Sequence, residues 1–410
     1  MSPSTPRLLP GQHPRLPVPQ PRSTDRLAIV SLVFSILGLL AFGIPALIGI
    51  ITGHISRSRI RKQPGRLVGS GLALTGVILG YAALVFWALV LGCLALISTI
   101  QRASENIAKQ SATLRHEDLV QKTQENARAR HAFKTRLLRK EREDVPADPP
   151  APATGMKLVS YPGPLGDMAA YVSTDPADGK KHPAIIWLIG GFSNSISADV
   201  LPKGDDPEND QSASAFREAG LLMLYPSLRG GNQNPGFKEG LLGEVDDVLA
   251  ALAWLKQQPY IDPARIYLGG HSTGGTLALL VAGSTTDLRA VISFGPAHST
   301  AAYGQDVLPF DVENEAEAIP RAPILCLDAI NAPTFVIEGV KGNIESLRRM
   351  RRSHSSRFIQ YFEIPAADHF QVLRPLSELL AKSLLQDTGP TPNIVINHAM
   401  LKAAMEAPEK

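Results

Sequence analysis

The chain has 410 residues, of which 44% are hydrophobic and 19% are charged, and its formal net charge is +3. This composition is too apolar for a disordered chain, and so small and scattered a charge gives no reason to expect a nucleic-acid partner. The two cysteines, Cys93 and Cys326, are too few for a thiolate metal site and predict no disulfide. The sequence therefore indicates a protein of two or three units, for which we expect neither a metal nor a cofactor.

The N-terminal quarter carries most of the apolar excess. Residues 1–26 are rich in Pro, Ser and Arg and lack periodicity, which predicts a disordered tail. Two runs without a charged residue follow, Leu27–Gly53 and Leu67–Gln101, and each exceeds the roughly 20 apolar residues that cross a bilayer as a helix. We therefore predict a two-span transmembrane domain over residues 27–101. A cleaved secretory signal fits less well, because the first run is long, begins late and is followed by a second.

The turn between the two runs indicates the orientation. Its basic residues are Arg57, Arg59, Arg61, Lys62 and Arg66. Short basic loops stay in the cytoplasm, so we expect this turn inside a bacterial cell membrane and both termini outside it. The reverse orientation stays open, because the N-terminal tail is basic as well.

Glycine pairs occur at a spacing that lets membrane helices approach closely, at Gly49 and Gly53 and at Gly76 and Gly80. With the basic turn, they make residues 26–100 resemble a small bacterial double-span domain of unknown function that precedes various extracytoplasmic domains. Such contacts permit a dimer without requiring one, so the oligomeric state stays open.

A charged segment follows the predicted membrane domain. Residues 102–144 mix both signs of charge with Ala, Leu and Gln and contain neither Pro nor Gly, which predicts a long solvated helix. Four prolines between positions 146 and 152 end it. We interpret residues 102–154 as a helical stalk and a Pro-rich linker.

Residues 155–390 alternate short apolar runs with helical stretches, which predicts a mostly parallel sheet covered on both faces. We expect an opening hairpin at 156–161 and 168–173, then strands at 183–189, 221–225, 266–268, 290–294, 334–337 and 358–364. Helices are predicted at 244–256 and 376–385, and residues 391–410 form a C-terminal tail without an assigned structure.

One serine stands where a strand is predicted to turn sharply into a helix. Ser272 lies in Gly270-His271-Ser272-Thr273-Gly274, between the apolar strand 266–268 and the helical stretch 276–280. Such a turn raises a hydroxyl above the sheet, and flanking glycines let strand and helix pass closely. The five-residue pattern arises by chance roughly 0.2 times in a chain of this composition, so its context carries the prediction.

Several motifs, in this order, resemble the α/β-hydrolase fold, and most of all its prolyl-oligopeptidase and dienelactone-hydrolase branch. The resemblance covers residues 155–387 and rests on Gly190-Gly191, Arg229-Gly230-Gly231-Asn232, the stretch 246–255, Asp262-Pro263-Ala264-Arg265-Ile266, the Ser272 turn and Asp368-His369-Phe370. It implies a fold and a serine hydrolase, but no particular substrate.

The resemblance also implies roles for individual residues. Ser272 is the nucleophile and His369, after the last strand, is its base, whereas His271 is structural. The oxyanion hole takes one backbone N–H from Thr273 and one from Gly191 or Phe192.

The acid of the triad departs from the pattern. Relatives place an Asp three residues after the Gly that ends the seventh strand. Here the strand ends at Gly339, and the corresponding position is occupied by Gly342. We favour Glu338, because it lies nearest the carboxyl edge of the sheet and is costly to bury unpaired. Glu345 and, as a neutral substitute, Asn343 stay open. Two aspartates are less favoured because of their positions: Asp328 lies before the seventh strand, and Asp368 lies directly beside the proposed base.

The insertion 296–332 is expected to form a lid over a substrate pocket or, alternatively, a plain surface loop. We therefore predict a membrane-anchored serine hydrolase that cleaves esters, or short peptides, through an acyl-Ser272 intermediate. Esters are favoured because no propeller or other gating domain is present, an argument by analogy. The alternative is a catalytically silent hydrolase-fold protein that binds or scaffolds at the cell envelope.

Overall fold

The computed structural model describes residues 22–201, 209–354 and 356–407. The predicted disordered tail therefore lies almost wholly outside the described residues. The chain divides into two compact units, Met1–Ala112 and Thr113–Lys410. Helix α3 (Ser70–Ala132) contributes to both units.

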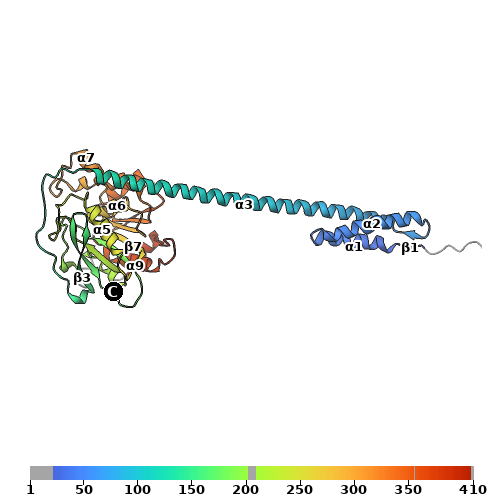
Figure 1. Ribbon diagram of the computed structural model, residues 1–410, viewed down its shortest axis with the longest axis horizontal. Coiled ribbons are helices and arrows are strands. Elements are labelled where there is room, and N and C mark those ends of the chain that lie inside the picture. The colour runs from blue at the N-terminus through green and yellow to red at the C-terminus, as the bar shows by residue number, and fades with distance from the viewer. Residues whose placement is uncertain (1–21, 202–208, 355, 408–410) are drawn as a thin grey trace, which may run out of the picture. The chain divides into compact units, whose positions relative to one another are not determined.

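The N-terminal unit contains three helical segments instead of the two predicted spans. Its helices are α1 (Arg26–Leu40), α2 (Ile44–Lys62) and the first part of α3 (Figure 1). The first apolar run breaks because Gly43 takes a left-handed conformation at φ 77°, with Pro45 in the first turn of α2. Glycine reaches that conformation without strain, and Pro is tolerated only at the start of a helix. The prediction of one continuous span over Leu27–Gly53 is therefore wrong.

Small residues hold these helices together. A Cβ atom added at Gly49 would lie 2.1 Å from Ser35 Oγ, and one at Gly76 would lie 2.2 Å from Ser31 Oγ. Ser31 Oγ donates to the carbonyl of Gly49 at 2.7 Å, and Ser35 Oγ donates to that of Gly76 at 2.6 Å. Glycine thus lets α1 contact both α2 and α3 closely enough for hydroxyl-to-backbone hydrogen bonds.

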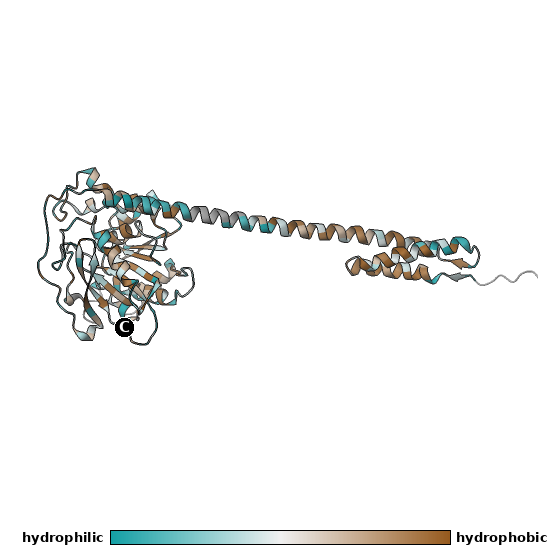
Figure 2. Ribbon diagram, in the orientation of Figure 1, coloured by the Kyte–Doolittle hydropathy of each residue, from teal (hydrophilic) through white to brown (hydrophobic). Residues whose placement is uncertain are grey.

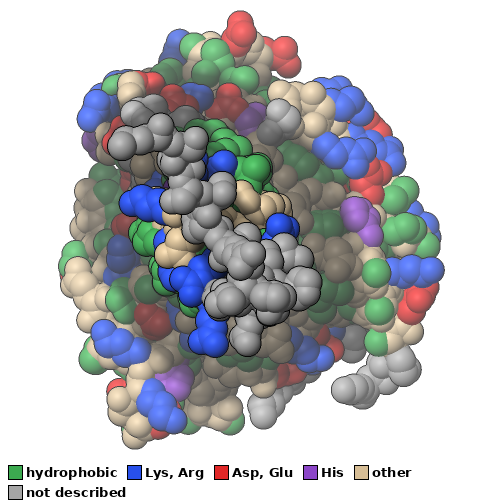
Figure 3. All heavy atoms as spheres, turned by 90° about the vertical axis from the view of Figure 1, so that its right-hand side faces the viewer, with side chains coloured by type: hydrophobic (Ala, Val, Ile, Leu, Met, Phe, Trp, Pro, Cys, Tyr) green, Lys and Arg blue, Asp and Glu red, His purple; other side chains and the backbone are tan. Residues whose placement is uncertain are grey.

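The start of α1, the end of α2 and the start of α3 meet at one end of this unit. Strand β1 (Ser23–Thr24) pairs in parallel with β2 (Leu67–Val68), which directly precedes α3. The last turn of α2 holds Arg59, Arg61 and Lys62, and Figure 3 shows Lys and Arg side chains gathered at this end.

One helix among the described residues is long and apolar enough to cross a membrane, the stretch Ser70–Asn106 of α3. Its most apolar part is almost entirely exposed, and Figure 2 shows the change in α3 from a hydrophobic first part to a hydrophilic second part.

The predicted solvated stalk is corrected in its second half, because α3 ends at Ala132 and its last turns pack on the C-terminal unit. Thr123 Oγ1 donates to the carbonyl of Ala329 at 2.6 Å, and Asn126 Nδ2 donates to that of Gly283 at 2.7 Å. Arg130 is buried and pairs with Asp246.

The chain after α3 continues across the same unit. Leu137 forms a β-bridge with Phe310, and Tyr171 Oη donates to the carbonyl of Asp148 at 2.7 Å. This charged segment therefore packs on the C-terminal unit although its composition suggested a solvated one. Residues 113–154 belong to that compact unit.

The C-terminal unit is built on an eight-stranded sheet, which confirms the predicted α/β-hydrolase architecture. The strand order is β10-β9-β8-β7-β5-β6-β4-β3. Strands β3 and β4 form the predicted antiparallel hairpin, β4 pairs antiparallel with β6, and the other pairs are parallel. The strands are β3 (Met156–Gly163), β4 (Gly166–Ser173), β5 (His182–Leu188), β6 (Leu222–Pro226), β7 (Ile261–His271), β8 (Val291–Phe294), β9 (Thr334–Gly339) and β10 (Ile359–Ile364).

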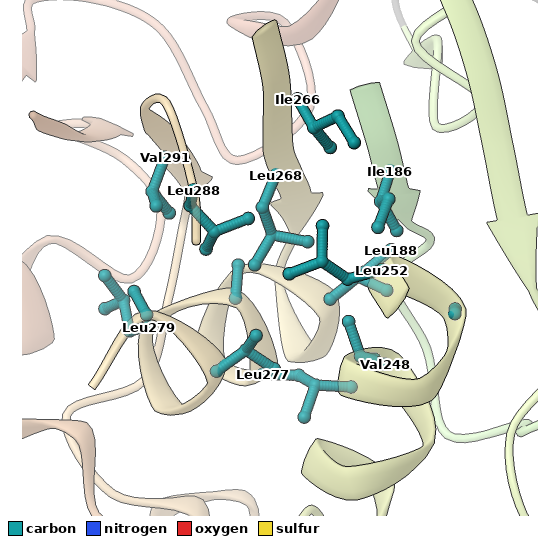
Figure 4. Packing of buried hydrophobic residues seen from close by; sticks show 14 of the residues in the cluster. Ile186, Leu188, Val248, Leu252, Ile266, Leu268, Leu277, Leu279, Leu288 and Val291 are labelled. Atoms are coloured by element: carbon teal, nitrogen blue, oxygen red, sulfur yellow. The ribbon is translucent and has the colours of Figure 1, made fainter. Parts of the chain in front are cut away.

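Helices cover both faces of the sheet, so alternate side chains of each central strand enter two different cores. On one face Ile186 and Leu268 pack against α5 and α6 (Figure 4), whereas on the other Trp187 and Tyr267 pack in the cluster that includes α9. The helices are α4 (Ser214–Glu218), α5 (Glu244–Leu255), α6 (Thr273–Ala282), α7 (Glu315–Ala318), α8 (Ile344–Ser353), α9 (Leu373–Gln386) and α10 (His398–Glu406).

The C-terminal segment is part of this core and not a free tail. Asp387 accepts hydrogen bonds from Arg289 and from Tyr267, and Leu401 of α10 is buried in the core cluster on the α9 face.

Candidate active site

Ser272 occupies a strained turn between β7 and α6. Its backbone has φ 56° and ψ −117°, which is unusual for a residue with a side chain. The turn needs glycines: a Cβ atom at Gly270 would lie 2.4 Å from the Gly274 carbonyl oxygen, and one at Gly274 would lie 2.0 Å from that of Leu188. The local sequence therefore permits a strand-to-helix bend that few other sequences could form.

His369 and Glu338 form a hydrogen-bonded pair at the same edge of the sheet. His369 lies in the loop after β10, and its Nδ1 is 2.9 Å from Glu338 Oε2 at the end of β9. Because the carboxylate is the acceptor, Nδ1 carries the proton and Nε2 is left with a lone pair. Glu338 is fully buried, and its oxygens also accept the backbone N–H groups of Gly339 and Asn343 at 2.7 and 2.9 Å.

The space beside Glu338 explains why the usual position of the acid is vacant. A Cβ atom at Gly342 would lie 2.6 Å from Glu338 Oε1. An aspartate at 342 and a glutamate at 338 would therefore compete for one place.

The other acids considered from the sequence have different partners. Glu345 pairs with Arg348 on the exposed side of α8, and Asp328 pairs with His354. Asp368 accepts the backbone N–H groups of Phe370 and Gln371 within its own loop, and these bonds lower the pKa of its carboxyl. None of these three carboxylates contacts His369 Nδ1 in the hydrogen bonds of the described residues.

Ser272 and His369 border the same turn after β8. The Ser272 N–H donates to the carbonyl of Phe294 at 2.8 Å, and a Cβ atom at the next residue, Gly295, would lie 2.3 Å from His369 Cε1. Across the described ranges, the Ser272 hydroxyl makes no hydrogen bond to His369. Such contacts are often long without substrate and shorten when it binds.

The proposed oxyanion donors are held next to each other. Thr273 Oγ1 donates to the carbonyl of Gly191, which has φ 102° in the loop after β5. The backbone N–H groups of Thr273 and Phe192 make no hydrogen bond to another backbone group in the described part of the chain, which leaves them available to a ligand.

Sequence reasoning did not single out the contact that covers this site. Tyr303, in the insertion 296–332, packs edge to face on Phe192 with ring centroids 5.5 Å apart, and its hydroxyl is 2.7 Å from Thr276 Oγ1. Burial raises the pKa of Tyr303 to about 12, so its hydroxyl stays protonated. Tyr303 lies within the predicted insertion, but no pattern in the sequence of the insertion indicates which of its residues contacts α6.

Comparison with known families gives two matches. The profile of a domain of unknown function (DUF4190) matches residues 27–91, and that of the prolyl oligopeptidase family matches residues 207–339. The second match contains Ser272 and Glu338 and ends before His369.

Curated relatives are distant. An uncharacterized 31.7 kDa protein from the traX-finO intergenic region of Escherichia coli is 29% identical over 164 residues, which are 40% of this chain and 51% of the relative. A thiohydrolase of Arthrinium phaeospermum is 28% identical over 120 residues, 28% of this chain and 36% of the relative. The chain spans about half the length of the curated relatives it matches.

Solved structures include a puromycin-hydrolyzing peptidase of Mycobacterium tuberculosis, with 19% identity, a TM-score of 0.46 and coverage of 58% of this chain and 40% of that one. An esterase of Pyrococcus furiosus has 16% identity, a TM-score of 0.45 and coverage of 60% and 97%. Strand order, the strained serine turn and the matched profile together identify residues 113–410 as an α/β-hydrolase-fold unit whose central part is similar to the prolyl oligopeptidase family.

Proposed function

We propose that this protein is a serine hydrolase that cleaves carboxylic esters through an acyl-Ser272 intermediate. The observation that carries the proposal is the hydrogen-bonded pair of His369 and Glu338 at the sheet edge that also holds the strained Ser272 turn. A buried carboxylate that fixes the tautomer and orientation of a histidine near a serine hydroxyl is the arrangement that activates serine.

The reaction follows from these positions. Ser272 Oγ attacks the ester carbonyl and its proton passes to His369 Nε2, while Glu338 stabilises the imidazolium through Nδ1. The carbonyl oxygen becomes negative and accepts the N–H groups of Thr273 and of Gly191 or Phe192. The leaving alcohol takes the proton from Nε2. Water then attacks the acyl-enzyme, gives its proton to Nε2, and Ser272 regains a proton as the carboxylic acid leaves.

Compact acyl groups suit the space beside the oxyanion loop. A cavity of about 40 Å³ lies there beside Gly191 and Thr273, and its lining includes Leu188, Leu228, Leu241 and Leu277. This volume accommodates a few water molecules or a short alkyl group, and not a long chain. We therefore expect acetyl and propionyl esters to be better substrates than long-chain esters.

Membrane attachment is the second part of the proposal. It is supported by the apolar stretch Ser70–Asn106, whose most apolar part is almost entirely exposed, and by the match to the domain of unknown function over residues 27–91. Exposed apolar side chains on α1 and α2, such as Leu40 and Ile44, add to it, since so much apolar surface is unfavourable in water.

A fluorophosphonate probe tests the activity directly, because it reacts with an activated serine. We expect stoichiometric labelling of the full chain in detergent, loss of labelling in Ser272→Ala, and normal labelling in the control Ser299→Ala. Hydrolysis of p-nitrophenyl acetate should fall by about 10⁴-fold or more in Ser272→Ala. Absence of labelling in folded wild-type protein would overturn the proposal.

A scaffold role is the second candidate. It is favoured by the Ser272 hydroxyl, which is not hydrogen-bonded to His369 in the described structure, and by the contact of Phe192 with Tyr303 above the turn. A folded protein that resists the probe and shows no esterase activity would support this candidate.

A further inference from the structure

His271 is a second histidine in the site, next to the nucleophile but outside the proposed reaction. It is the last residue of β7 and is fully buried. Its ring centroid lies 4.4 Å from that of His369, and Phe370 packs on it at 5.3 Å. The side chain of His271 is therefore enclosed by the loop that carries the proposed base.

One hydrogen bond joins His271 to that loop. Its Nε2 is 3.1 Å from the backbone carbonyl oxygen of His369. A carbonyl oxygen only accepts, so Nε2 carries the proton and Nδ1 has a lone pair. That Nδ1 is buried and has no hydrogen-bond partner among the described residues.

The surroundings keep the ring of His271 in this neutral form. Burial, and then the neighbouring His369, lower its pKa to about 3. A neutral neighbour does not repel the positive charge that His369 gains when it takes a proton, whereas a cationic one at this distance would. Gly190 leaves room for the ring, since a Cβ atom there would lie 3.0 Å from Nδ1.

His369 is thus held from two strands. Glu338, at the end of β9, holds its imidazole, and His271, at the end of β7, holds its backbone. His271 directly precedes Ser272 in the chain. Its hydrogen bond to the His369 carbonyl therefore fixes the position of the proposed base relative to the nucleophile.

We propose that His271 is a positioning residue that ties the His369 loop to the Ser272 turn through its neutral Nε2–H tautomer. The inference rests on the proposed serine hydrolase function and adds to it a residue that acts through the base and does not touch the substrate. A purely structural histidine would affect the stability of the fold and leave the turnover of the folded enzyme unchanged.

Two substitutions separate these roles. His271→Leu fills the site with an apolar side chain of moderate size and removes the Nε2–H donor. His271→Gln instead places an amide N–H near the former Nε2. With p-nitrophenyl acetate, we expect kcat per probe-reactive serine to fall by about 10- to 100-fold in His271→Leu, with KM changed by less than about threefold, because a misplaced base slows the chemical step alone. His271→Gln should recover most of the loss. Equal kcat in wild type and His271→Leu would overturn the proposal.

The tautomer provides a measurement that does not depend on activity. In wild-type protein labelled with ¹⁵N-histidine, one ring should stay neutral and protonated at Nε2 from about pH 8 to about pH 5, where an ordinary histidine titrates. Its signal should vanish in His271→Gln. A proton on Nδ1, or titration near the ordinary value, would overturn the inference. Failure of wild type to react with the probe would instead overturn the proposed function, so the two failures are distinguishable.

Discussion

At the scale of single residues, the proposed triad takes its acid from a position that differs from the related pattern. Glu338 contacts His369, while Gly342, where the related pattern places an aspartate, leaves the space that the glutamate needs. Gly342 does not take a left-handed conformation, so its backbone tolerates a side chain.

This exchange predicts a rescue. Glu338→Ala should lower kcat for p-nitrophenyl acetate by about 10³- to 10⁴-fold, because the base loses its orientation and its counter-charge. Adding Gly342→Asp should then recover about tenfold or more, since the space beside His369 is free in that variant. Gly342→Asp alone should lower activity, because its side chain clashes with Glu338. A double variant no better than Glu338→Ala would show that position 342 cannot supply the acid.

The burial of His271 has a consequence for stability. Its folded pKa of about 3 lies below the unfolded value of 6.5, so the unfolded chain binds the extra proton between these two values. The free energy of unfolding should therefore fall as the pH drops from 6.5 towards 3, by up to about 1.4 kcal/mol per pH unit from this group. Denaturant unfolding at several pH values should give a shallower slope for His271→Gln. Identical slopes would mean that His271 is protonated in the folded state.

At the scale of elements, the segment that follows the apolar stretch is a structural part of the hydrolase unit. Glu317 of α7 accepts hydrogen bonds from Thr135 Oγ1 at 2.8 Å and from the Arg136 N–H at 2.7 Å. The same carboxylate pairs with the guanidinium of Arg321, which is fully buried. This contact joins the chain after α3 to the insertion 296–332.

Removal of that carboxylate should be costly. Glu317→Ala leaves the Arg321 charge buried without its carboxylate partner, and we expect a loss of about 3–5 kcal/mol in the free energy of unfolding. The matched control, Glu315→Ala, alters an exposed residue of the same helix and should change stability by less than about 0.5 kcal/mol. Denaturant unfolding of both variants gives the comparison. Equal stabilities would show that the segment after α3 is not integral to the unit.

At the scale of the whole molecule, the helices of the N-terminal unit suggest a second membrane topology beside the predicted two-span one. Strand β1, directly before α1, pairs with β2, directly before α3. The chain therefore runs away along α1 and comes back along α2 to the end of the unit where α1 begins. If α3 crosses the membrane once, the N-terminal tail and the basic end of α2 share one side and the hydrolase unit emerges on the other. In that arrangement we expect the basic end of α2 to lie in the cytoplasm and the C-terminal unit outside the membrane.

Cysteine accessibility tests this arrangement. In a chain with Cys93 and Cys326 replaced by Ser, Lys402→Cys in α10 should react with an impermeant maleimide in intact cells. Ser23→Cys, in β1 directly before α1, should react only after lysis. Both positions are exposed, so access and not burial decides the result. Labelling of both in intact cells would support the two-span arrangement instead.

Local patterns were sufficient for much of this protein. Alternating apolar residues and the glycines around Ser272 act over a few neighbours, so the strands, the strained turn and the position of His369 after the last strand could be predicted. The sequence by itself thus determined the fold class and the order of its elements.

The tertiary structure decided the features that depend on distant contacts. Which carboxylate meets His369 depends on the register of β10 beside β9, where Glu363 lies opposite Glu338. Whether a charged helix is solvated depends on the surface that buries Arg130, which pairs with Asp246. The composition of a segment does not reveal such contacts, because the partner residues lie far away in the sequence.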